Sequence, residues 1–67
     1  MISSIEVDEH YNRIVIPFRS IAYYSYTDNY IFIYVYGRST PFGISGDNVA
    51  WFQRWYTRWL TCYQQND

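Results

Sequence analysis

The chain has 67 residues, of which 49% are hydrophobic and 24% are aromatic, and its formal net charge at pH 7 is −1. This length predicts a single domain, residues 1–67, and so many aromatic residues exclude an intrinsically disordered chain. Five arginines and no lysine stand against six acidic residues, so we expect no binding to DNA through neutralisation of its phosphates.

The sequence also indicates where in the cell we expect the protein. Its first residues have neither the basic nor the apolar region of a secretory signal, and one cysteine cannot form an intrachain disulfide. The longest strongly apolar run, residues 30–36, is far shorter than the roughly 18 to 20 residues of a membrane helix. We therefore expect a cytoplasmic protein that does not bind membranes.

Residues 1–12 form an acidic N-terminal segment, because Glu6, Asp8 and Glu9 fall close together beside His10. Ile2, Ile5 and Val7 give only a hint of alternation, so we expect a frayed or edge segment here.

Residues 13–44 are expected to form an antiparallel sheet. A short strand over 14–16 ends at Pro17, which cannot donate to a ladder. Residues 20–27 and 30–37 are rich in β-branched and aromatic residues, and the turn residues Asp28 and Asn29 between them predict a hairpin. Residues 40–44 are a candidate fourth strand. The sequence therefore predicts a three- or four-stranded meander.

A C-terminal amphipathic helix is expected over residues 47–64, after the capping residues Ser45, Asp47 and Asn48. Its apolar residues cover about half of the circumference, wider than the ~100° stripe that one packing face requires. One side of this arc should meet the sheet and the other something else. The predicted fold class is α+β, with the meander followed by this helix.

The hairpin register predicts two different sheet faces. With a two-residue loop, Thr27 faces Tyr30, Ser25 faces Phe32, Tyr23 faces Tyr34 and Ile21 faces Tyr36. The opposite face, with Ile31, Ile33 and Val35, is aliphatic and is assigned to the helix. The first face then carries a tyrosine plate made of Tyr23, Tyr30, Phe32, Tyr34 and Tyr36, although a slip of one residue would exchange the two faces.

The sequence offers little for catalysis. A zinc site needs three or four ligands, and the chain has one histidine, His10, and one cysteine, Cys62. Residues 43–48, GISGDN, lack the spacing of a dinucleotide fingerprint and the lysine of a P-loop. They are interpreted as a strand exit and helix cap, with an anion site as the open alternative. We expect no enzyme, no cofactor and no metal.

The surplus aromatic surface points to binding. The predicted partner-binding residues are Tyr23, Phe32, Tyr34 and Tyr36 with Arg19 and Arg38, because tyrosine, phenylalanine and arginine are enriched at protein interfaces. A homo-oligomer interface is predicted at the helix ridge of Trp51, Trp55 and Trp59. The alternatives are nucleotide or single-stranded RNA bound by stacking on the plate, and coverage of the plate by the N-terminal segment.

In its size, mild acidity, lack of catalytic residues and aromatic surplus, the chain resembles the small inhibitors that phages encode against bacterial defence systems, anti-CRISPR proteins among them. This resemblance implies a non-catalytic, homo-oligomeric binding protein that occupies a macromolecular partner, and it assigns no residue. Residues 16–25 and 28–35, followed by a helix, are also similar to strands of LytTR-type DNA-binding domains, but the chain is shorter than these domains and its charge does not suit DNA.

Overall fold

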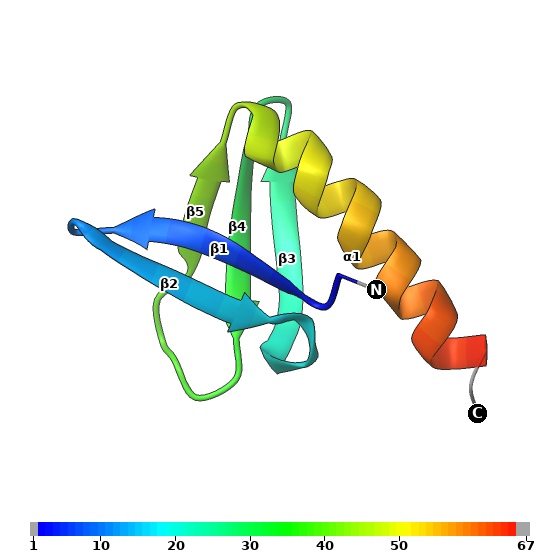
Figure 1. Cartoon of the computed structure of the whole chain (residues 1–67). Helices are drawn as coiled ribbons and strands as arrows, with labels where there is room; N and C mark the ends of the chain where they lie inside the picture. The colour runs from blue at the N-terminus through cyan, green and yellow to red at the C-terminus, as the bar shows by residue number, and fades with distance from the viewer. Residues whose placement is uncertain (1, 66–67) are drawn as a thin grey trace.

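The structure is a computed structural model that describes residues 2–65, with side chains described through Cys62. Its strands are β1 (Ser4–Glu9), β2 (Asn12–Pro17), β3 (Ile21–Thr27), β4 (Tyr30–Val35) and β5 (Phe42–Ser45), followed by the helix α1 (Asp47–Gln65) (Figure 1). A 3-10 turn, η1 (Phe18–Ser20), separates β2 from β3. The α+β class is confirmed, with antiparallel strands followed by one C-terminal helix.

The strands form two sheets, β1–β2 and β3–β4–β5, where we expected one sheet over residues 13–44. The division falls at Pro17 and η1, where the Ser20 hydroxyl donates a hydrogen bond to the Pro17 carbonyl at 2.7 Å. The chain turns there and carries Phe18 into the core. Strand β3 therefore starts a second sheet instead of extending the first.

The N-terminal segment is an edge strand, one of the two expected alternatives, and it is not frayed, because residues Ser4–Glu9 form the full strand β1 of a two-stranded sheet. Ile5 and Val7 are buried, while Glu6 and Asp8 alternate with them on the solvent side. Only two apolar residues carry this alternation, which is why the sequence signal was weak. The β1–β2 turn also lacks glycine, since His10 and Tyr11 occupy it with φ values of 51° and 66°.

The β3–β4 hairpin confirms most of the predicted register. Thr27 pairs with Tyr30, Ser25 with Phe32 and Tyr23 with Tyr34. The predicted pairing of Ile21 with Tyr36 is wrong, because a shift between Ile21 and Tyr23 pairs Ile21 with Val35. This irregularity turns Ile21 into the core, where it is buried.

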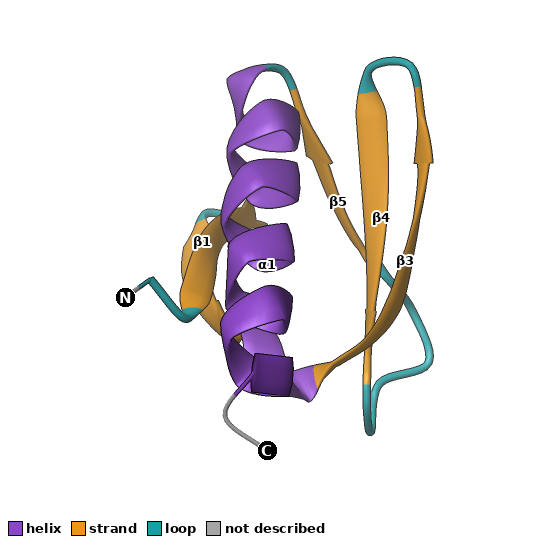
Figure 2. Cartoon of the chain, turned by 90° about the vertical axis from the view of Figure 1, so that its right-hand side faces the viewer, coloured by secondary structure: helices purple, strands orange, loops and turns teal. Residues whose placement is uncertain are grey.

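The core lies between the two sheets and α1. In Figure 2, α1 and β1 lie on the same side of the β3–β4–β5 sheet. Val49, Phe52 and Tyr56 form the buried stripe of the helix. The Phe18 ring makes edge contacts to Phe52, Tyr56 and Trp59, with centroids 6.2, 5.4 and 5.9 Å away. The wide apolar arc of α1 thus meets both the sheet and the turn that joins the two sheets.

Candidate interaction surface

The face of the β3–β4–β5 sheet that points away from α1 carries four aromatic rings, which we call the outer aromatic face: Tyr23, Tyr30, Phe32 and Tyr34. They arise from the alternation of β4 and β3, which turns Ile31 and Ile33 of β4 into the core. The rings of Tyr23 and Tyr34 stack at 4.5 Å with an interplanar angle of 14°, and Tyr30 lies 5.0 Å from Phe32. The rings therefore form two adjacent pairs, one across β3 and β4 and one along β4.

Gly43 on β5 extends this surface. It pairs with Phe32 in the sheet, and a Cβ atom at Gly43 would lie 2.8 Å from the Tyr30 hydroxyl oxygen. The Tyr30 side chain therefore lies across β5 in a space that only glycine leaves open. Gly43 was not predicted as a site residue, although its alternation with the apolar residues Phe42 and Ile44 pointed to this face.

The outer aromatic face is open and uncharged. The Tyr23 side chain is 59% exposed, and Tyr30 and Phe32 are also exposed. The remaining outward positions of the three strands are small or hydroxyl-bearing residues, all exposed: Ser25, Thr27, Gly43 and Ser45. Each outward position in these strands therefore lacks a formal charge.

Three of the six predicted partner-binding residues, Tyr23, Phe32 and Tyr34, meet on this face. Tyr36 lies beyond the end of β4, where it borders a shallow hollow with Val15 and Pro17 of β2. The structure thus brings together the ring pairs that the register predicted, and it places Tyr36 apart from them.

The two predicted arginines lie outside the strands that carry the rings. Arg19 is exposed in η1. Arg38 is half-buried, and its Nη2 lies 2.8 Å from a carboxylate oxygen of Glu9, while its guanidinium carbon lies 3.8 Å from the centre of the Phe42 ring. Arg38 is thus held within the fold.

The three tryptophans predicted as an oligomer interface have different surroundings. Trp59 packs on Phe18 at 5.9 Å and on Tyr56 at 6.0 Å, so it supports the core. Trp55 is partly buried, with the guanidinium groups of Arg54 and Arg58 at 5.5 and 5.3 Å from its ring. Trp51 is exposed, near Ile2 and Ile5. The three tryptophans form one continuous ridge along the helix, and Trp51 and Trp55 form the part of this ridge that faces outward.

Tyr56, which lies in the core, has a shifted pKa. Burial raises the pKa of the Tyr56 hydroxyl above its usual value, and the nearby Tyr24 and Tyr36 add to this effect. Across the described residues, no three histidine, cysteine, aspartate or glutamate side chains gather where they could hold a metal ion. Within the same part of the chain, no helix is long and apolar enough to cross a membrane.

Comparisons of the chain with protein-family models, with curated proteins and with solved structures give no match.

Proposed function

We propose that this chain is a small, non-catalytic, homo-oligomeric binding protein that occupies a protein partner through its outer aromatic face. The observation that carries the proposal is that four adjacent rings lie on one uncharged sheet face, where Tyr23, Tyr30 and Phe32 are exposed and Tyr34 is partly exposed. Monomeric proteins rarely leave a contiguous apolar patch of this kind uncovered unless it binds something. Tyrosine and phenylalanine supply large contact areas at protein interfaces.

The same face favours a protein over a nucleotide or RNA. Stacked bases bring phosphates with them, and sequence-tolerant RNA-binding sheets place basic side chains around their aromatic residues. Here Arg38 is engaged by Glu9, and Arg13 lies 3.6 Å from both Glu6 and Asp8 on the other sheet. A partner that presents neutral apolar and hydroxyl groups is the better chemical match for a face whose strand positions carry no formal charge.

The outline shared with small phage-encoded inhibitors makes a protein of a bacterial defence system the first partner to test. The experiment is capture of such purified proteins by the immobilised chain, with Tyr23→Ala as the variant and Tyr26→Ala as its matched control. Tyr26 lies on the same strand, on the opposite face, and is 61% exposed against 59% for Tyr23. We expect Tyr23→Ala to lose capture and Tyr26→Ala to retain it, with both variants folded.

A salt titration separates the two classes of partner. Binding led by phosphates weakens steeply as salt is added, whereas an apolar protein interface changes little. Capture that is lost equally in both variants, or that falls steeply with salt, would argue against an outer aromatic face that binds protein.

A further inference from the structure

Strand β1 has an edge that faces away from its only strand partner among the described residues, β2. The β1–β2 turn contains two residues, so the flanking pair Glu9 and Asn12 is hydrogen-bonded, and every second pair after it is as well. The amide of Phe18 continues this ladder by donating to the Ser3 carbonyl at 2.8 Å. The backbone N–H and C=O groups of Ser4, Glu6 and Asp8 therefore point away from β2.

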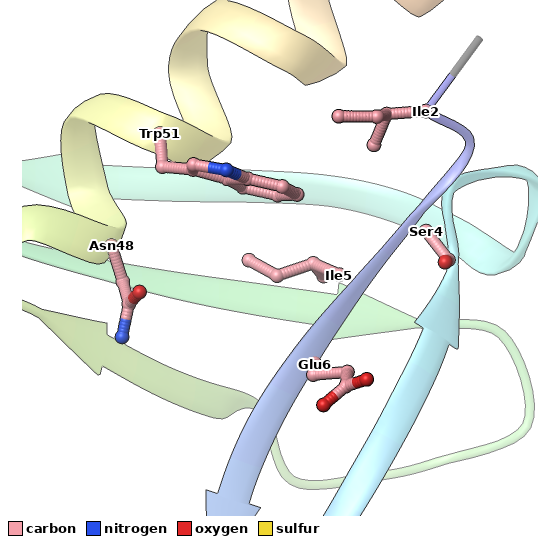
Figure 3. A pocket seen from close by; sticks show the side chains of 6 residues that line it. All are labelled: Ile2, Ser4, Ile5, Glu6, Asn48 and Trp51. Atoms are coloured by element: carbon pink, nitrogen blue, oxygen red, sulfur yellow. The ribbon is translucent and has the colours of Figure 1, made fainter.

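This free edge borders a hollow of about 350 Å³. The hollow is lined by a residue just before β1, by residues of β1 and by residues in the first turns of α1: Ile2, Ser4, Ile5, Glu6, Asn48 and Trp51. Figure 3 shows the Trp51 indole and the Ile5 side chain reaching into the space between β1 and α1. An exposed strand edge beside an apolar hollow is the arrangement in which proteins add an extended peptide as a further strand.

The opposite edge of the same sheet is protected. By the same ladder, the outward backbone positions of β2 are Arg13, Val15 and Pro17. Pro17 has no N–H group to donate, and proline on an edge strand is a common way to prevent pairing with another chain. Of the two edges of this sheet, β1 therefore has the more complete set of outward donors and acceptors.

The charges along β1 select the kind of strand that would pair with it. The outward side chains of β1 are Ser4, Glu6 and Asp8, and the two carboxylates share Arg13, which lies 3.6 Å from each. A second copy of β1 would place acidic residues against acidic residues, which destabilises cross-strand pairs. Basic side chains on the added strand would instead face Glu6 and Asp8.

We propose that β1 binds a short extended segment of a partner protein in which basic and apolar residues alternate. The segment pairs with the outward backbone groups of Ser4 and Glu6. Its apolar side chains lie on the Ile5 side, against Trp51, and its basic side chains lie on the Glu6 side, because residues of neighbouring strands share their faces. This site is separate from the outer aromatic face and does not depend on it.

The test uses a blocked hexapeptide of alternating arginine and valine, titrated into the full-length protein and followed by NMR. We expect shifts at the amides of Ser4 and Glu6 and at the Trp51 indole N–H. A peptide with glutamate in place of arginine should bind about tenfold more weakly or not at all, since its favourable cross-strand pairs with Glu6 and Asp8 become repulsive.

Four variants locate the site. Ser4→Pro removes one outward donor without touching the β1–β2 ladder, and it should lose most of the affinity, while Ser4→Ala should keep it. Val15→Pro removes an outward donor on the edge of β2 instead, and it should also keep the affinity for the peptide. Glu6→Arg should exchange the preference, so that the glutamate peptide binds better than the arginine peptide.

The proposal is overturned if neither peptide binds at millimolar concentration, if folded Ser4→Pro binds as the unmodified protein does, or if Glu6→Arg keeps the original preference. Protection of the Glu6 amide from hydrogen exchange in the absence of peptide would also overturn it, since a second copy would then occupy the edge. Tyr23→Ala is the control that distinguishes the β1 site from the outer aromatic face. It should leave peptide binding unchanged whether or not the outer aromatic face binds a protein.

Discussion

Arg38 and Glu9 connect the two sheets across 29 positions of sequence: Nη2 of Arg38 lies 3.0 and 2.8 Å from the two carboxylate oxygens of Glu9. The Arg38 Nε also donates to the Thr40 carbonyl at 3.0 Å. The loop between β4 and β5 is therefore fixed to the end of β1 by a charge-assisted contact. Arg38 was predicted at the rim of the partner surface, whereas its observed contacts stabilise the fold.

The first prediction concerns this ion pair. Both side chains are partly buried, so a double-mutant cycle of Arg38→Ala and Glu9→Ala should give a coupling energy of about 1 kcal/mol, the upper end for pairs open to solvent. The free energy of unfolding, measured by urea titration, is the readout. Arg38→Glu should destabilise more than Arg38→Ala because it places two carboxylates together. A coupling energy near zero would contradict a structural role.

The second prediction tests the two faces of β4. Ile33 is 0% exposed, so Ile33→Ala should lower the free energy of unfolding by about 2–5 kcal/mol because it leaves a cavity in the core. Tyr34→Ala, one position along and on the outer aromatic face, should cost far less. Thermal melting of both variants compares them directly. The reverse order of stabilities would mean that the hairpin register is inverted.

The elements with strong hydrophobic and turn patterns were predictable from the sequence, and the elements without such patterns were missed. The β3–β4 hairpin was predictable because Asp28 and Asn29 separate two long runs of strand-forming residues. The β1–β2 hairpin was missed because its turn residues, His10 and Tyr11, are not typical of the backbone that they adopt.

The candidate site was predicted where it depends on local alternation and missed where it depends on tertiary contacts. The pairing of Tyr23 with Tyr34 follows from a two-residue loop. In contrast, the contact of Arg38 with Glu9 depends on how two sheets cross, and no local pattern encodes that crossing. The same reason hides the hollow between β1 and Trp51 from the sequence.

The third prediction uses the β1–β2 turn. Both His10 and Tyr11 have positive φ, which costs on the order of 1 kcal/mol or more for a residue with a side chain, whereas Asn-Gly suits this turn. The double variant His10→Asn, Tyr11→Gly should therefore raise the free energy of unfolding by about 1 kcal/mol. The Tyr11 side chain is fully exposed, so its removal loses no packing. A destabilised variant would show that the native turn makes contacts beyond its backbone.

The fourth prediction follows from the raised pKa of Tyr56. A hydroxyl that holds its proton more tightly in the folded state stabilises the fold fully below the unfolded pKa, near 10, and this stability is lost as the pH rises through the folded pKa. Tyr56→Phe should therefore lose less stability between pH 9 and pH 11 than the unmodified protein does. Melting temperatures across this range provide the measurement, and the remaining tyrosines are common to both proteins. Parallel curves would contradict the prediction.

The last prediction is that the protein forms a homo-oligomer through the tryptophan ridge at Trp55, with Trp51 left to the hollow beside β1. Trp55 presents a partly buried indole between Arg54 and Arg58, and tryptophan and arginine are both among the residues enriched at interface hot spots. Trp59, in contrast, packs on Phe18. Trp55→Ala should act mainly on association and shift the protein toward monomer, because truncating such an anchor commonly costs about 2 kcal/mol or more of association energy. Since Trp55 also packs against the core, its removal should lower the melting temperature, but by less than the removal of Trp59.

Trp59→Ala should instead lower the melting temperature, because it removes a ring from the aromatic cluster around Phe18. Sedimentation across the micromolar range, with Tyr23→Ala run in parallel, distinguishes the two surfaces that could join copies of the chain. Dissociation by Tyr23→Ala and not by Trp55→Ala would assign self-association to the outer aromatic face. A monomer at every concentration would remove the oligomer from the proposed function and leave the aromatic face free for its partner.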